Sequence, residues 1–285
     1  MITILTPTFN RGKLLPNIFD SLRCQTSQSF EWIIVDDGSE DDTREVVARM
    51  SVSATFPLHY IHKQNGGKHT ALNRGLATAK GELVLILDSD DQLPPHATQD
   101  IEKAWAKVRD DKSCAGVCGY MAHRNGKVIG RPMVDSLTDT LGLRYKLGVS
   151  GDMAEVYRTD ILKQYPFPEI PGEKFCPEAL VWNRISQKYK ILVFSKVIYY
   201  RDYLDGGLTG SIVRIRMKSP VASMMTYQEM VSYRVPLKIK IRAAINYWRF
   251  WCCRANNPYP KLNFLWAWAF PLGVLSHWRD LIKTR

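Results

Sequence analysis

The stretch LVLILDSDD, residues 83–91, passes abruptly from five apolar residues to three aspartates and a serine. A short continuous apolar run is typical of a strand that is buried on both faces of a sheet. Six segments before it alternate between strand-like runs and helical spacing of apolar residues: 2–5, 14–22, 32–35, 42–50, 58–62 and 70–78. Strands that alternate with helices predict an α/β fold with a mostly parallel sheet covered by helices.

Polar clusters follow each of the four strand-like runs. They are TPTFNR at 6–11, DDGS at 36–39, NGGK at 65–68 and DSDD at 88–91. Ligands of such sheets bind beyond the carboxyl ends of the strands, which is where these clusters fall. Each cluster alone is also explained as a turn, with Ser39 or Asp42 as a helix cap. Four clusters in succession favour a binding site.

Asp88 and Asp90 stand in alternation at the end of the most apolar of these runs. Two carboxylates in a crevice of low dielectric constant repel each other, and a bound divalent cation removes that repulsion. Hard oxygen ligands suit Mg²⁺ or Mn²⁺, which such sites hold with one or two carboxylates plus substrate phosphates. We therefore predict a metal site at this pair. The alternative is a solvated turn that leads into the Leu93-Pro94-Pro95 segment.

In their order and approximate spacing these clusters resemble those of the inverting, family-two glycosyltransferases with the GT-A fold. The resemblance rests on TPTFNR at 6–11, VDDGSEDDT at 35–43, NGGKHTALNRGL at 65–76 and LDSDD at 87–91, and it covers roughly residues 1–200. It implies a Rossmann-like, mostly parallel mixed sheet flanked by helices. It also implies metal-dependent transfer of a sugar, with inversion, from a nucleoside-diphosphate donor to an acceptor hydroxyl, with UDP as the expected nucleotide and cell-surface polysaccharide as the expected product.

The family's donor-site roles carry over to the positions of this sequence that match its motifs. For the nucleoside, the implied contacts are Thr6, Pro7, Arg11, Asp36 and Asp37. Around the diphosphate and the metal, the implied residues are Lys68, Asp88, Ser89 and Asp90, with Asn73 and Arg74 as further candidates near the nucleotide. Lys68 offsets phosphate charge in this interpretation. The alternative for Lys68 is an exposed lysine at the start of a helix.

Inverting transfer needs a general base that takes a proton from the acceptor hydroxyl. Family members usually carry a Glu-Asp pair at the start of a helix in the second half, whereas this sequence reads GEKFCPEALVWNR at 172–184. Pro177 suits the first turn of a helix, which makes Glu178 the first candidate for the base. Glu173 and Asp152 are held in reserve. A glutamate at this position also simply favours the helix dipole.

The segment VIYYRDYLDGGLTGS, residues 197–211, combines a strand-like run with a glycine-rich loop. Some related enzymes offer a histidine here as a further metal ligand, but this sequence has no histidine between 124 and 276. That ligand is either absent, replaced by a group such as Asp202, or not needed. Arg201 and Thr209 are candidate phosphate contacts, with an ordinary surface loop as the equal alternative.

The net charge of +11 is confined to the end of the chain. Residues 1–205 hold 26 basic and 26 acidic side chains, and residues 206–285 hold 13 basic and 2 acidic ones. Balanced charge in the larger part argues against nucleic acid as the main partner. A sugar-1-phosphate nucleotidyltransferase, the rival enzyme class, would carry a glycine-rich phosphate loop after the first strand, which TPTFNR lacks. A non-catalytic membrane or polyanion-binding protein would show strongly salt-dependent binding.

We predict a catalytic domain at 1–211, with a nucleotide-sugar half at 1–95 and an acceptor half at 96–211, followed by a helical extension at 212–285. The extension combines Lys and Arg with many Trp, Tyr and Phe residues, as interfacial membrane helices do. Its apolar run at 262–275 is 14 residues long, too short to span a bilayer. We therefore expect it to lie in a membrane surface, with packing on the core or dimerisation as alternatives.

The six cysteines show no CxxC pair, so neither a zinc site nor a disulfide framework is indicated. The N-terminal stretch lacks a basic segment and a cleavage site, and we therefore expect no signal peptide. These features favour a reduced, cytoplasmic setting at the inner face of the cytoplasmic membrane, with a nucleotide-sugar and a glycan or lipid-linked acceptor as partners.

Overall fold

The computed structural model describes residues 1–285 apart from 132–133, 202–207, 255–257 and 284–285. The chain forms two compact units. The first comprises Met1–Pro166 and Arg184–Tyr203, and the second comprises Phe167–Asn183 and Leu204–Arg285. The segment 167–183, which lies inside the expected 1–211 domain, thus groups with the C-terminal helices.

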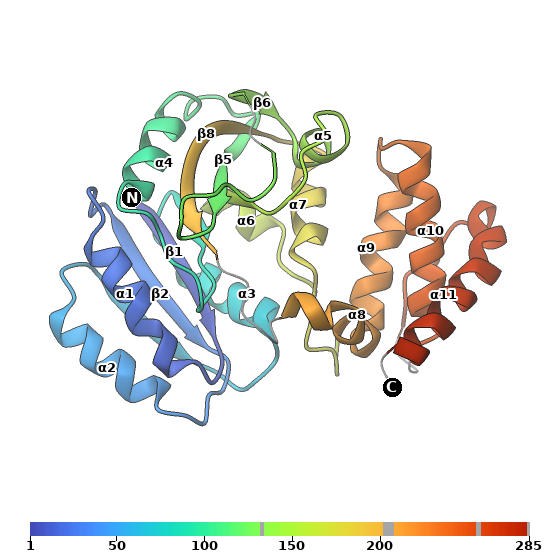
Figure 1. The fold of residues 1–285 in the computed structure, drawn as a ribbon, viewed down its shortest axis with the longest axis horizontal. Coiled ribbons are helices and arrows are strands. Elements are labelled where there is room, and N and C mark those ends of the chain that lie inside the picture. Colours follow the sequence, from blue (N-terminus) through green and yellow to red (C-terminus); the bar gives the residue numbers. More distant parts are fainter. Residues whose placement is uncertain (132–133, 202–207, 255–257, 284–285) are drawn as a thin grey trace. The chain divides into compact units, whose positions relative to one another are not determined.

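One sheet forms the centre of the first unit (Figure 1). In the described residues it has eight strands in the order β3-β2-β1-β4-β7-β5-β8-β6. Their bounds are β1 Ile2–Thr8, β2 Phe30–Asp36, β3 Leu58–His62, β4 Leu83–Ile86, β5 Cys114–Ala122, β6 Ser136–Thr138, β7 Met153–Arg158 and β8 Lys190–Tyr200. Strands β3, β2, β1 and β4 are parallel, as are β5 and β8, whereas β7 and β6 are antiparallel to their neighbours. The expected mostly parallel mixed sheet is confirmed.

Helices cover both faces of this sheet. The helical elements of the unit are η1 Gly12–Leu14, α1 Leu15–Arg23, α2 Thr43–Ser53, α3 Lys68–Thr78, α4 Ala97–Ala106, α5 Thr140–Tyr145 and α6 Thr159–Gln164. Side chains of α1, α2 and α4 join the core on the face that carries Ile4 and Ile34. On the other face α3 approaches so closely that a Cβ on Gly75 would lie 2.2 Å from Leu5 and 3.0 Å from Val35. Neighbouring strand residues point to opposite faces, which explains this division.

Several elements extend beyond the predicted limits. Strand β1 continues to Thr8, because the Thr-Pro-Thr segment stays in register with β2 as far as Asp36. Helix α3 begins at Lys68, two residues before the predicted start. Gly67 precedes it with φ of 96°, a conformation that glycine adopts without strain, and so allows this early start.

The second unit is helical, as predicted for the end of the chain (Figure 1). Helix α7 (Glu178–Ser186) begins in it, and it continues with α8 Leu208–Lys218, α9 Pro220–Ser232, α10 Leu237–Trp251, η2 Phe264–Ala269 and α11 Phe270–Lys283. Helix α10 lies between α9 and α11 and contacts both. Met224, Tyr247 and Phe250 form a small hydrophobic core in the second unit. None of the helices in the described part of the chain is long and apolar enough to cross a membrane.

Candidate functional site

Three carboxylates gather directly after β4. One oxygen from each of Asp88, Asp90 and Asp91 lies within 4.8 Å of the other two. A tight turn, closed by the Asp91 N–H donating to the Asp88 carbonyl at 3.1 Å, brings them together. The sequence predicted the pairing of Asp88 with Asp90, and the structure adds Asp91, which is 3% exposed. A cluster of hard oxygen donors of this kind fits Mg²⁺ or Mn²⁺.

Two cations from other strand ends face this acidic cluster. Lys68, the first residue of α3, lies with its Nζ 2.5 Å from Asp88 Oδ1. Arg11, which follows β1, lies 3.0 Å from Asp90 and donates to the Ser89 hydroxyl at 3.2 Å. The charged side chains are between 21% and 33% exposed, so the cluster is open to solvent. Predicted site residues from three different motifs therefore meet at one place.

Opposite charges shift the pKa values of the cluster in opposite directions. Burial works to raise the pKa of Asp88, but the charges of Lys68, Arg201 and Arg11 outweigh it and hold that pKa below its usual value. Burial and the neighbouring Asp88 charge raise the pKa of Asp91 to about 7. Negative charge is thus crowded in this partly buried cluster, and a divalent cation would relieve the crowding.

Strand β8 and the residue that follows it contribute two side chains beside this cluster, Tyr199 and Arg201. The Tyr199 hydroxyl donates to Asp91 Oδ2 at 2.8 Å and accepts the N–H of Asp88 at 3.0 Å, so it fixes the acidic turn. Arg201 forms an ion pair with Asp152 at 2.9 Å. Asp152, a reserve candidate for the base, therefore pairs with a cation whose charge also lowers the pKa of Asp88. Asp202 lies outside the described residues, as does the side chain of Thr209.

Asp37 fixes the loop that leads into α3. Its carboxylate accepts hydrogen bonds from Gly66 N–H at 2.9 Å and Gly67 N–H at 2.7 Å, and it pairs with Lys63 Nζ at 2.6 Å. The side chain is almost fully buried. Asp37 thus positions Lys68 through the backbone. A nucleoside contact by Asp37 itself stays a prediction.

Asp36 and Thr6 are also buried. Asp36 accepts from Ser39 N–H at 2.8 Å and from the Tyr60 hydroxyl at 2.5 Å. The Thr6 hydroxyl accepts from Trp32 Nε1 at 2.9 Å, and its side chain is fully enclosed. Both side chains hold the strand ends in place. A nucleoside contact at Thr6 would have to come from its backbone, and one at Asp36 or at the buried Pro7 stays a prediction.

Thr8, which the sequence analysis did not select, is the last residue of β1 and pairs with Asp36. Its hydroxyl is buried and has no hydrogen-bond partner among the residues that the structure describes. A buried polar group without a partner costs free energy unless a ligand or a water molecule satisfies it. Thr8 is therefore a further candidate contact for a ligand at the strand ends, although its side chain is 3% exposed.

The second unit carries the candidate base. Glu178 is half-buried and is the first residue of α7, as the proline before it predicts. Glu173 has a different role: its two carboxylate oxygens accept the N–H groups of Val221 at 2.6 Å and Ala222 at 2.9 Å. Those N–H groups belong to the first turn of α9, so Glu173 caps that helix. This geometry favours Glu178 over Glu173 as the base.

The replacement Glu173→Ala is expected to destabilise the second unit by about 1–3 kcal/mol, because it leaves two buried helix N–H groups unpaired. Chemical denaturation followed by circular dichroism measures the change in the free energy of unfolding. Glu173→Gln, which keeps one acceptor oxygen, should lose less. A variant with unchanged stability and abolished transfer would contradict the capping role.

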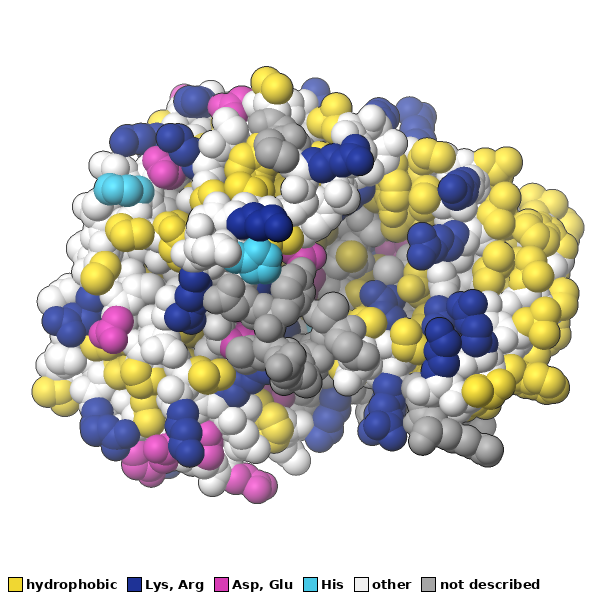
Figure 2. Space-filling view, viewed as in Figure 1, with side chains coloured by type: hydrophobic (Ala, Val, Ile, Leu, Met, Phe, Trp, Pro, Cys, Tyr) yellow, Lys and Arg dark blue, Asp and Glu magenta, His cyan; other side chains and the backbone are white. Residues whose placement is uncertain are grey.

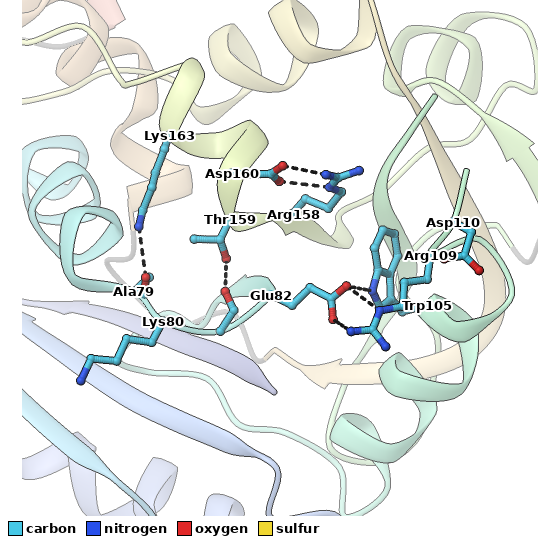
Figure 3. A pocket seen from close by; sticks show the side chains of 11 residues that line it. Ala79, Lys80, Glu82, Trp105, Arg109, Asp110, Arg158, Thr159, Asp160 and Lys163 are labelled. Carbon is cyan, nitrogen blue, oxygen red and sulfur yellow. Dashed lines mark hydrogen bonds and ion pairs between the residues drawn. The ribbon is translucent and has the colours of Figure 1, made fainter. Parts of the chain in front are cut away.

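A cavity of about 500 Å³ lies at the opposite end of the parallel strands, before β4 (Figure 3). Charged side chains line it, and five of them pair with one another or with other groups of the protein. Glu82 binds Arg109 at 2.8 Å and Trp105 Nε1 at 3.0 Å, Arg158 binds Asp160, and Lys163 donates to a backbone carbonyl. These internal pairs hold the chain segments together, and the cavity lies away from the carboxyl ends of the parallel strands.

Residues 3–165 match the family described as Glycosyl transferase family 2. Glycosyltransferase GlyG of Streptococcus pneumoniae is 37% identical over 232 residues, which cover 75% of this chain and 73% of that protein. The GalNAc(5)-diNAcBac-PP-undecaprenol beta-1,3-glucosyltransferase of Campylobacter jejuni is 27% identical over 217 residues, 73% of this chain and 67% of that protein. Other relatives match over only 36% of their own length.

Two solved structures share the fold. S. aureus TarS 1–349 in complex with UDP superposes with a TM-score of 0.62 at 21% identity, over 88% of this chain and 70% of that one. The mannosyltransferase PcManGT of Pyrobaculum calidifontis, in complex with GDP-Man and Mn²⁺, gives 0.60 at 19% identity, over 96% and 73%. The family match spans more than half of the chain and sets aside the nucleotidyltransferase and non-catalytic alternatives. The chain is therefore a glycosyltransferase and belongs to Glycosyl transferase family 2.

Proposed function

We propose that this glycosyltransferase moves a sugar, with inversion, from a UDP-sugar to a hydroxyl of a lipid-linked glycan acceptor in cell-surface polysaccharide synthesis. A divalent cation, Mn²⁺ or Mg²⁺, takes part, and the reaction runs at the inner face of the cytoplasmic membrane. The observation that carries the proposal is the meeting of Asp88, Asp90 and Asp91 with Lys68 and Arg11 at the strand ends. The UDP complex of TarS and the lipid-linked substrate in the Campylobacter enzyme's name support the donor and the acceptor class.

The donor half of the mechanism follows from the charges at the site. Asp88 and Asp90, with Asp91 beside them, would hold the cation, which when bound neutralises the charge on the departing diphosphate. Lys68 and Arg11 are paired to carboxylates at present. If those carboxylates held a cation, Lys68 and Arg11 would be available to pair with the phosphate oxygens of the donor. Lys68 and Arg11 would therefore balance the carboxylate charges when the donor is absent and the phosphate charges when it is bound.

The acceptor half needs one proton transfer. We assign it to Glu178, which takes the proton from the acceptor hydroxyl as that oxygen bonds to the anomeric carbon. The bond between the anomeric carbon and the diphosphate oxygen breaks at the same time, and its electron pair leaves with the diphosphate. Attack from the face opposite to the leaving group inverts the anomeric configuration.

Calorimetric titration of UDP and of GDP, each with and without Mn²⁺, tests the proposal. We expect UDP to bind more tightly than GDP and Mn²⁺ to strengthen its binding. Absence of binding by either nucleotide under every condition would overturn the proposed donor site.

The same titration of Lys68→Met isolates the phosphate contact. Loss of a charge-assisted hydrogen bond is worth about 1.5–3 kcal/mol, so UDP affinity should fall roughly tenfold to a hundredfold. Lys103→Met, on the exposed surface of α4, is the matched control and should bind UDP like the unaltered protein. Equal UDP affinity for the two variants would show that Lys68 is only a surface lysine.

A further inference from the structure

Helix α11 turns its polar side inward. Asp280 is 4% exposed and forms a two-point ion pair with Arg249 of α10. His277, one turn earlier, lies 3.5 Å from the sulfur of Cys253. Gly273 lets the helix approach α10 so closely that a Cβ would lie 2.4 Å from Trp248. After Phe270, which packs on Trp248 and Trp251 of α10, the inward stripe of α11 is glycine, histidine and aspartate, where a surface helix normally places its apolar residues.

The opposite side of α11 is apolar and faces outward. Together with η2 it exposes nine large hydrophobic side chains, and we call eight of them, all except Phe270, the outer face: Phe264, Leu265, Trp268, Leu272, Leu275, Trp278, Leu281 and Ile282. Their exposed fractions range from 43% to 82%. Figure 2 shows hydrophobic side chains gathered over this part of the helical unit. Exposed apolar patches of this kind mark surfaces that bind another apolar surface.

The charges beside the outer face are almost all positive. Residues 206–285 hold 13 basic and 2 acidic side chains. Of the two acids, Asp280 is buried against Arg249, and the Glu229 carboxylate accepts a hydrogen bond from the Tyr233 hydroxyl. Exposed cations stand on α10 and α11, namely Lys238, Arg242, Arg279 and Lys283. Figure 2 shows Lys and Arg side chains next to the apolar ones.

We propose that the outer face docks on an anionic lipid bilayer, with η2 and α11 lying in its interface. Indole rings and apolar side chains enter the boundary region, while Arg279 and Lys283 meet anionic headgroups. A second copy of this chain fits less well, because pairing two outer faces would bring like charges together. Docking on a bilayer rests on the proposed function in one respect: a lipid-linked acceptor lies at a membrane surface.

Sedimentation with vesicles tests the docking, using phosphatidylcholine with and without phosphatidylglycerol and no donor or acceptor. We expect binding to the anionic vesicles that weakens with added salt. The variant Leu275→Ser/Trp278→Ser/Ile282→Ser should lose roughly a hundredfold in vesicle affinity, because it removes three apolar contacts. The variant Arg279→Gln/Lys283→Gln should lose roughly tenfold, and only on anionic vesicles.

Val52→Ser, which removes an apolar side chain that is 90% exposed on α2, is the matched control and should leave vesicle binding unchanged. Circular dichroism and UDP titration of each variant establish that folding and the donor site are intact. Failure of the unaltered protein to bind vesicles would overturn the docking proposal. So would a concentration-dependent dimer that the triple variant abolishes. Vesicle binding without any nucleotide binding would overturn the donor proposal alone.

Discussion

Replacing Asp88 and Asp90 together by asparagine is expected to reduce sugar transfer at least roughly a thousandfold and to remove the effect of Mn²⁺ on UDP binding. The change keeps the size of both side chains but removes two of the three carboxylates in the cluster. An amide offers one weak ligand oxygen where a carboxylate offers two charged ones. Lys68 and Arg11 also lose their partners, so binding of the nucleotide alone should persist or strengthen.

Calorimetry with and without Mn²⁺, combined with a transfer assay, measures both effects of the double variant. Asp110→Asn, at the cavity before β4, is the matched control and should change neither sugar transfer nor the effect of Mn²⁺ on UDP binding. If the double variant still binds UDP in a Mn²⁺-dependent way, the acidic cluster is not the metal site. Persisting binding without Mn²⁺ dependence, together with lost transfer, is the expected outcome.

The second large effect is expected from Glu178→Gln. General-base catalysis is worth about 10²–10⁴ in rate, so kcat should fall by that factor while the Kd for UDP with Mn²⁺ stays unchanged. This split separates loss of the base from damage to the donor site, because the amide keeps the shape but cannot accept the proton. Single-turnover transfer and UDP titration on the same preparation measure the two quantities.

Glu169→Gln, in the same unit and exposed, is the control for Glu178→Gln and should keep normal turnover. Unchanged turnover of Glu178→Gln would overturn the assignment of the base and direct attention to Asp152. Reduced stability of the Glu178 variant would instead point to a helix-dipole role, and denaturation detects it.

Much of the charged cluster at the strand ends was predictable because its signals are local. An apolar run that ends in DSDD specifies a buried strand and the acidic turn after it, and NGGK specifies a tight loop before α3. Parallel strands align their carboxyl ends. The order of the strands is therefore enough to predict that Lys68, Asp88 and Arg11 lie close together.

Other parts of the site depend on partners that are far away in the chain. Tyr199 binds Asp91 across 108 positions, and no local pattern marks either residue as part of a pair. Glu173 caps a helix that begins almost fifty residues later, so its sequence context looks as suitable for a base as that of Glu178. The Thr6 hydroxyl is likewise enclosed because Thr6 lies on the face of β1 that meets Trp32, and the local sequence does not specify that contact.

The ion pair between Arg249 and Asp280 has a mechanical consequence. Removing either partner by mutation would leave the other charge largely buried in the contact between α10 and α11, which typically costs about 3–5 kcal/mol. The ion pair therefore holds α11 against α10 as a fixed part of the second unit. The proposed docking then requires the folded unit. Because vesicles would bind the folded state and not the unfolded one, anionic vesicles should raise the melting temperature of that unit.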